Sequence, residues 1–135
     1  MIDHIAGLIF NENKELLVVR KKNNRPECIL PGGKREQDET DEKTLKRELI
    51  EELGIEIKDM QYFNTYYGKP VFKEDNLFKQ TAYIVIPENM KIEAKSELQE
   101  ILWIDTNYKN KGIICNEILE LQTIPDLIGR NYIKE

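Results

Sequence analysis

The sequence contains few of the residues that most often bind transition metals or form cross-links. It has two cysteines, Cys28 and Cys115, and one histidine, His4. Because the cysteines lie far apart and neither has a metal-type spacing, their positions predict no cysteine-based metal site. We expect both to be reduced, buried, apolar side chains in a cytoplasmic protein. We expect His4 to pack within a strand and to take no part in catalysis.

The sequence also lacks a long apolar run and an excess of positive charge. No stretch is long enough to span a bilayer, and residues 1–14 show no basic region followed by an apolar one, so we expect neither a membrane helix nor a signal peptide. The 20 Lys and Arg residues are outnumbered by 25 Asp and Glu residues. Because affinity for long nucleic acid comes mainly from Lys and Arg, this balance argues against such a partner. A small phosphorylated ligand bound through a metal remains compatible with it.

Length and pattern predict one folded domain over residues 1–135. A chain of this size buries about two-thirds of its unfolded surface, and 40% of its residues are hydrophobic. Strand patterns before, between and after two helical patterns indicate an α/β (α+β) protein with a mixed sheet between helices. We expect strands over residues 4–10 and 15–21 as a hairpin, then strands within 55–68, 79–87 and 101–105, helices over 41–53 and 112–122, and a final helical turn within 124–133.

The helix expected over residues 41–53 has a signal at each end. Thr40 can cap its N-terminus, and Gly54 fits a left-handed conformation just past its C-terminus. Leucine recurs every four residues from Leu45 to Leu53, which predicts one apolar face. The sequence therefore defines this helix more sharply than any other element.

Three carboxylates, Glu48, Glu51 and Glu52, lie on the flank beside that apolar face. Like charges three or four residues apart destabilise a helix by a few tenths of a kcal/mol per pair, so the cluster needs a compensating cation. Hard divalent cations such as Mg²⁺ prefer oxygen ligands of this kind. Without further context, a solvated acidic face paired with Lys46 and Arg47 is the alternative interpretation.

The surrounding residues complete a longer pattern. Gly33 is followed after five residues by Glu39, and after seven more by Arg47-Glu48-Leu49, any residue, Glu51-Glu52, any residue and Gly54-Ile55. This stretch resembles the Nudix box, G-x5-E-x7-R-E-U-x-E-E-x-G-U, in which U is aliphatic. Every defined position is filled and every gap has the right length. The chain therefore resembles the small MutT-type members of the Nudix hydrolase family.

The resemblance implies a Nudix fold, with a mixed β-sheet sandwiched between α-helices and the box as loop–helix–loop. It implies hydrolysis of a nucleoside diphosphate linked to a further group X, with Mg²⁺ or Mn²⁺ as cofactor. By matched position, Glu48, Glu51 and Glu52 would bind the metal, and Glu48 or Glu52 would also orient or deprotonate water. The carbonyl of Gly32 would be a further ligand.

Other residues take supporting roles by the same resemblance. Arg47 would hold the carboxylates in place, and Glu39 would tie the loop to the helix. Independently of the resemblance, Gly33 lets the backbone approach a bound group closely, and we expect it to contact the substrate. Position 44 departs from the family, with Thr44 where alanine is common, and we expect an effect on packing only. Relatives often add a glutamate shortly before a tryptophan-containing strand.

That additional glutamate has two candidates, Glu97 and Glu100, which precede Trp103. We favour Glu97 by its distance from the tryptophan, although simple exposure of both side chains is the alternative. Upstream of the box, Arg20 and Arg25, together with Lys21 and Lys22, are candidates to meet substrate phosphates or are only the charged end of a hairpin.

The sequence contains no separate motif for the substrate. Six aromatic residues offer rings that stack on a base or pack in the core, namely Tyr62, Phe63, Tyr66, Tyr67, Phe72 and Phe78. A nucleoside triphosphate is the favoured small-molecule substrate, with ADP-ribose or another nucleotide sugar as the alternative. A sensor that binds nucleotide without cleaving it is a second alternative, although every box glutamate is present. RNA cap removal fits the acidic balance poorly. The resemblance also allows a homodimer.

Overall fold

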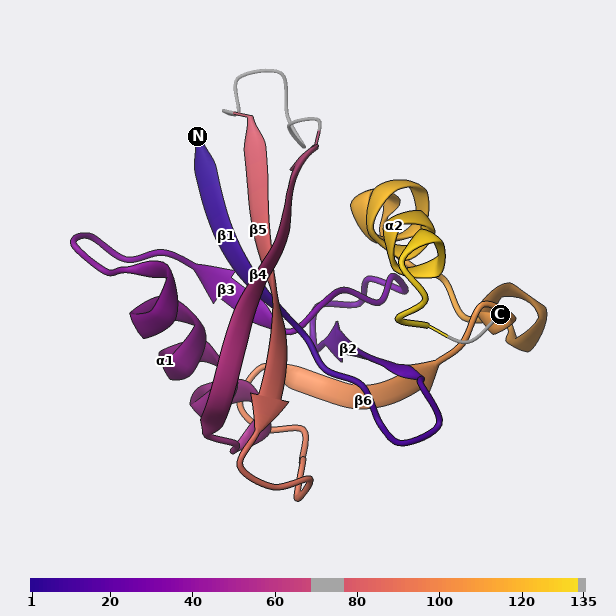
Figure 1. The fold of residues 1–135 in the computed structure, drawn as a ribbon, viewed down its shortest axis with the longest axis horizontal. Coiled ribbons are helices and arrows are strands. Elements are labelled where there is room, and N and C mark those ends of the chain that lie inside the picture. The colour runs from indigo at the N-terminus through magenta and orange to yellow at the C-terminus, as the bar shows by residue number, and fades with distance from the viewer. Residues whose placement is uncertain (69–76, 134–135) are drawn as a thin grey trace.

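The computed structural model describes residues 1–68 and 77–133 (Figure 1). Its strands are β1 (Ile2–Leu8), β2 (Leu16–Lys21), β3 (Gly32–Lys34), β4 (Ile57–Gly68), β5 (Phe78–Pro87) and β6 (Leu98–Ile104). Its helical elements are α1 (Asp41–Leu53), the 3₁₀-helix η1 (Tyr108–Lys111), the π-helical turn η2 (Leu119–Thr123) and α2 (Ile124–Gly129). The expected aromatic Phe72 lies outside the described residues.

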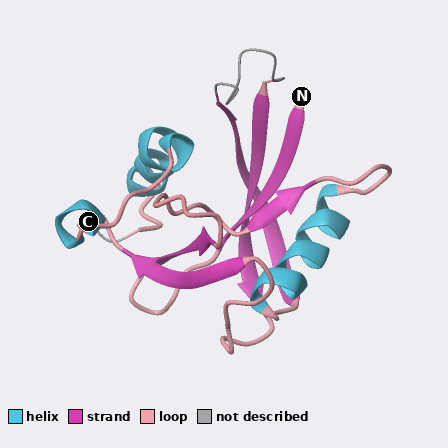
Figure 2. Cartoon of the chain, turned by 180° about the vertical axis from the view of Figure 1, so that it is seen from behind, coloured by secondary structure: helices cyan, strands magenta, loops and turns pink. Residues whose placement is uncertain are grey.

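Two sheets organise the described chain. Four strands form a mixed sheet in the order β3-β1-β5-β4, in which β1 runs parallel to β5 and antiparallel to β3. Strands β2 and β6 form a separate antiparallel pair. Figures 1 and 2 show α1 beside the four-stranded sheet and α2 on the other side of the molecule. The α+β class with a mixed sheet between helices is therefore confirmed.

Helix α1 begins and ends where its capping residues predict. The Thr40 side chain accepts a hydrogen bond from the Lys43 N–H, and Gly54 has φ of 67°. The leucines from Leu45 to Leu53 are fully buried and share a core cluster with Ile5 of β1. This apolar face fixes the rotation of α1 about its axis, and so it decides where the adjoining carboxylates point.

The expected hairpin over residues 4–21 forms only at its turn. There Phe10 and Leu16 form an antiparallel bridge, and the Leu17 N–H donates to Ile9 O at 2.9 Å. The strands β1 and β2 themselves belong to different sheets. Strand β1 instead lies between β3 and β5. Strand β3 forms at the glycine pair, because Gly32 and Gly33 pair with Ala6 and Ile5 of β1.

The expected helix over residues 112–122 is also displaced. Residues 112–116 are not helical, because their backbone bonds to a distant loop. The Cys28 N–H donates to Ile114 O at 2.7 Å, and the Asn116 N–H donates to Cys28 O at 3.0 Å. The Asn116 side chain then accepts from the Leu119 N–H at 2.9 Å, and helical structure runs from residue 117 through η2 and α2.

Strand β4 is an edge strand, and the C-terminal helical segment covers part of it. Gln122 Nε2 donates to Tyr67 O at 3.0 Å, and Arg130 Nη1 donates to Phe63 O at 3.5 Å. The Arg130 guanidinium also lies 4.5 Å from the centre of the Phe63 ring. Such cover protects a strand edge from pairing with other chains. In the described part of the chain, no helix is long and apolar enough to cross a membrane.

Candidate active site

The glycine pair at the start of β3 lets backbone and carboxylate approach closely. Gly32 has φ of 142°, and a Cβ at this position would lie 2.0 Å from Ile5 O. A Cβ on Gly33 would lie 2.2 Å from Glu48 Cδ. Any larger residue at position 33 would therefore occupy the space that the Glu48 carboxylate fills.

Glu52 is the most deeply buried carboxylate of α1. Its side chain is buried, with the residue 5% exposed, and Oε1 accepts a hydrogen bond from the Gly32 N–H at 3.0 Å. Burial raises the pKa of Glu52 to about 7, and the charges of Glu48 and Glu97 add to the rise. The Gly32 hydrogen bond and the charge of Lys21 oppose it. Burial also raises the pKa of Glu48, against the opposing effect of its contact with Arg47.

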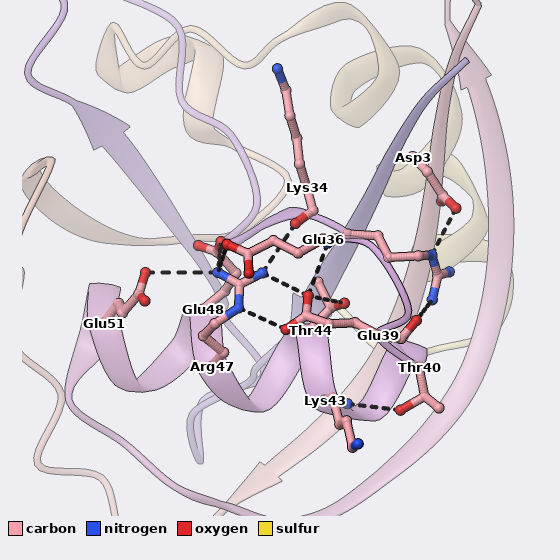
Figure 3. A network of polar contacts seen from close by, with 11 residues as sticks. Asp3, Lys34, Glu36, Glu39, Thr40, Lys43, Thr44, Arg47, Glu48 and Glu51 are labelled. Atoms are coloured by element: carbon pink, nitrogen blue, oxygen red, sulfur yellow. Dashed lines mark hydrogen bonds and ion pairs between the residues drawn. The ribbon is translucent and has the colours of Figure 1, made fainter.

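Arg47 joins Glu48 to the loop that precedes α1 (Figure 3). Its Nη1 donates to Glu48 Oε1 at 2.8 Å, and Nη2 donates to Lys34 O at 3.2 Å. Its Nε and Nη2 donate to the two oxygens of Glu39, each at 2.9 Å. These bonds lower the pKa of Glu39 to about 2. The buried Thr44 hydroxyl donates to Glu39 Oε1 at 3.0 Å, so its role extends beyond the packing expected for this departure from the family.

A second arginine, Arg35, fixes the same loop from its other side. Its guanidinium donates to Asp3 Oδ2 at 2.9 Å, to Glu39 O at 3.0 Å and to Asp41 Oδ1. The Tyr83 hydroxyl donates to the other oxygen of Asp41. The sequence did not predict this cluster, because its members come from β1, the loop, α1 and β5 and form no local motif.

The loop before β6 brings Glu97 towards the carboxylates of α1. The Lys95 N–H donates to Glu52 O at 2.8 Å, and the Lys22 N–H donates to Glu97 O at 2.8 Å. Glu100, the other candidate, is instead paired with Arg20, with Nε 2.7 Å from Oε1. These contacts favour Glu97 over Glu100 as the additional carboxylate of the site.

The structure separates the basic residues upstream of the box. Arg20 is engaged by Glu100, and Arg25 is exposed. The positive charge of Lys21 lowers the pKa of both Glu48 and Glu52. The sequence shows that Lys21 follows Arg20. It does not predict the register irregularity between these two residues in the pairing of β2 with β6.

A family model of the NUDIX domain matches residues 2–107, which is most of the chain. The chain belongs to the NUDIX domain family. As a member of this family the protein is a Nudix pyrophosphohydrolase.

Several solved structures share this fold. A MutT structure, from a study of the enzymes of Aliivibrio salmonicida and Vibrio cholerae, matches with a TM-score of 0.74 and 21% identity, over 96% of this chain and 98% of that one. The E. coli ORF135 protein matches with a TM-score of 0.70 and 23% identity, over 97% and 89%. The NUDIX domain of Shewanella oneidensis NrtR, solved with ADP ribose, matches with a TM-score of 0.73 and 16% identity, over 97% and 88%. No curated protein matches the chain.

The carboxylates of the Nudix box differ in position and in exposure to solvent. Glu48 and Glu52 meet at the glycine pair, whereas the Glu51 side chain is 56% exposed. Across residues 1–68 and 77–133, no three Cys, His, Asp or Glu side chains are already grouped to hold a metal ion. The oxygen-only donor set and the buried carboxylate of Glu52 nevertheless fit a hard divalent cation that takes few protein ligands and completes its coordination with water and phosphate.

Proposed function

We propose that the protein hydrolyses a nucleoside diphosphate linked to X in a reaction that depends on a divalent metal. The favoured substrate is a nucleoside triphosphate, which would yield a nucleoside monophosphate and pyrophosphate. The observation that carries this proposal is the buried Glu52 carboxylate, which lies with Glu48 against the Gly32–Gly33 backbone. Burial of two neighbouring carboxylates is costly without a cation and becomes favourable with one.

Five residues are the candidate ligands of the metal, of which one ion would take only some and complete its coordination with water and phosphate: Gly32 through its carbonyl, Glu48, Glu51, Glu52 and Glu97. Mg²⁺ or Mn²⁺ bound there would neutralise phosphate charge and would lower the pKa of bound water.

The protein's own groups position the reaction. Glu48 and Glu52 are the two groups able to orient or deprotonate the attacking water at the glycine pair. Arg47 holds Glu48 through the 2.8 Å hydrogen bond, which limits the motion of that carboxylate. Lys21 supplies a positive charge close to both glutamates, where substrate phosphates would lie. Because Gly33 has no side chain, the Glu48 carboxylate lies directly against the backbone on which substrate phosphate would bind. Such phosphate chemistry depends mainly on positioning and electrostatic stabilisation.

ADP-ribose is the second candidate substrate. The observation that favours it is the similar fold of the NrtR NUDIX domain, whose structure contains ADP ribose. A sensor without hydrolytic activity is a weaker candidate, because this chain has every glutamate of the box.

The test is a product panel with Mg²⁺ or Mn²⁺ over nucleoside triphosphates, dinucleoside polyphosphates, ADP-ribose and other nucleotide sugars. Monophosphate plus pyrophosphate would support the triphosphate assignment, and AMP plus ribose phosphate would support the sugar assignment. Binding without product would support the sensor. The Glu52→Gln variant, assayed beside wild type, shows whether any product comes from this site and not from a contaminating phosphatase.

Three further expectations remain predictions: a single domain over residues 1–135, a cytoplasmic location, and the option of a homodimer. Light scattering coupled to size-exclusion chromatography would measure the oligomeric state.

A further inference from the structure

The two cysteines of the chain meet in the folded protein, although they lie far apart in the sequence. Cys28, in the segment before β3, and Cys115, in the segment before η2, form an isolated parallel bridge. The Cys28 N–H donates to Ile114 O at 2.7 Å, and Cys28 O accepts from the Asn116 N–H at 3.0 Å. Residues paired in this way lie directly opposite each other, and their side chains point to the same face. Both cysteines are free thiols in the structure.

The spacing of this pair suits a disulfide. Paired strands lie about 4.8 Å apart, and cysteines joined by a disulfide usually have Cα atoms about 4.4–6.8 Å apart. The two side chains also belong to one buried core cluster, so they occupy the same apolar space. The charge of Cys28 adds to the effect of burial that raises the pKa of Cys115 to about 12. The backbone bridge therefore already holds the two residues within the range that a disulfide requires.

Cys115 lies beneath a short surface segment. Ile114, the residue before it, is 52% exposed, and Cys115 itself is 6% exposed against 2% for Cys28. Gly112 has φ of 77°, and its missing Cβ would meet open space. Backbone hydrogen bonds to Tyr108 and Cys28 hold the segment in place. Because the loss of a few such bonds opens the segment, a small oxidant reaches Cys115 before Cys28.

A covalent link between the cysteines would join two parts of the fold that hydrogen bonds and packing hold together. Cys28 lies just before the glycine pair of the Nudix box, and its neighbour Ile29 forms a bridge with Val19 of β2. Asn116 follows Cys115 and accepts a hydrogen bond from the Leu119 N–H, at the start of the C-terminal helical segment. That helical segment covers the edge of β4.

We propose that a peroxide oxidises Cys28 and Cys115 to an intramolecular disulfide, which fastens the C-terminal helical segment to the segment that enters the Nudix box. The Cys115 thiolate attacks a peroxide oxygen, the O–O bond breaks, and a sulfenic acid and water form. The Cys28 thiolate then attacks the sulfenic sulfur, the S–O bond breaks, the S–S bond forms and a second water leaves. The two thiols lose two electrons and two protons, and one hydrogen peroxide becomes two waters.

This inference is independent of the proposed function, because the reaction involves neither the nucleotide substrate nor the metal. Burial also raises the pKa of Cys28, and the charge of Glu100 adds to the rise while that of Arg20 opposes it. Since the thiolate is the nucleophile, both thiols should react slowly at neutral pH. The experiment therefore uses long exposure at pH 8.5, where a larger share of each thiol is ionised.

Peptide mapping of the full chain gives the direct test. The protein is reduced, freed of reductant, and held with excess hydrogen peroxide and a chelator. A tryptic digest without reductant should then link the peptide over residues 23–34 to the peptide over residues 112–130, each of which contains one cysteine. Neither peptide contains methionine, so oxidation elsewhere does not disturb their masses. The linked peptide should have lost the mass of two hydrogen atoms and should separate on treatment with dithiothreitol.

The disulfide should also stabilise the fold. It would close a loop on the order of 90 residues, which restricts the unfolded chain. The midpoint of urea unfolding should therefore rise by about 1–2 M in the oxidised protein relative to the reduced protein. Cys115→Ser is the matched control, because it retains the deeper thiol and lacks the one that reacts first. After the same peroxide treatment its midpoint should not rise.

Three results would overturn the proposal. The first is two free thiols after prolonged exposure, and the second is cysteine sulfur that carries oxygen or links two chains in place of the intramolecular bond. The third is a linked protein whose urea midpoint does not rise, since the bond would then fasten nothing. A product panel without hydrolysis would leave the peptide map unchanged, so this proposal and the proposed function fail separately.

Discussion

Replacement of Glu52 by glutamine should have opposite effects on turnover and on stability. The substitution keeps the shape of the side chain and an oxygen for the Gly32 N–H, but it removes the charge. If Glu52 binds metal and acts on water, turnover should fall by orders of magnitude. The fold should be more stable without metal, because a buried carboxylate loses its ionisation penalty.

The size and sign of the stability effect follow from the pKa. Glu52 titrates at about 7 in the folded protein against 4.5 in the reference state, a difference that corresponds to about 3 kcal/mol. Because the folded state favours the protonated acid, the penalty is absent below pH 4.5, grows as the pH rises, and is complete above pH 7. In the presence of a chelator at pH 8.5, Glu52→Gln should therefore unfold with a free energy about 3 kcal/mol larger than wild type.

Urea unfolding of wild type and variant at pH 4.5 and pH 8.5 measures this difference. Glu51→Gln makes the same chemical change on a side chain that is 56% exposed, and it should alter stability by no more than about 0.5 kcal/mol. The reasoning would be refuted if the Glu52→Gln variant were less stable than wild type at pH 8.5. It would also be refuted if the free energy of unfolding differed from that of wild type by the same amount at both pH values. Normal turnover in that variant would refute the assignment of the site.

Three other substitutions give expected outcomes. Gly33→Ala should lower kcat by at least tenfold with a folded spectrum by circular dichroism, because the new Cβ displaces the Glu48 carboxylate; unchanged kcat would contradict this geometry. Arg47→Lys should destabilise the protein by about 1–3 kcal/mol in urea, since a lysine cannot reproduce the bonds to both Glu39 and Glu48. Thr44→Ala should cost about 1 kcal/mol through its lost bond to Glu39, and no loss in urea would show that the hydroxyl contributes nothing.

The sequence predicted α1 and its neighbouring carboxylates because their determinants are local. A cap at Thr40, a left-handed glycine at Gly54 and a four-residue leucine spacing act within one helix, and the helix begins and ends as expected. The spacing of the Nudix box glutamates along the sequence depends on the same local helical structure. Helical periodicity then places Glu48 and Glu52 together without any knowledge of the rest of the fold.

The features that the sequence did not predict depend on partners distant in the chain. A turn between β1 and β2 suggested a hairpin, but each strand finds its main partner elsewhere. The glycine pair becomes strand β3 only because β1 lies beside it. The sequence could not distinguish the role of Lys21 from that of Arg20. The difference arises because Arg20 pairs with Glu100, which lies 80 residues later in the chain.

The side chains that cover the edge of β4 come from the last part of the described chain. A protein shortened before Gln122 would retain the whole Nudix box, yet the backbone oxygens of Phe63 and Tyr67 would lose their donors. Bare strand edges act as templates for neighbouring molecules. Truncation far from the chemistry would therefore lead to self-association and loss of soluble protein while the box residues themselves remained intact.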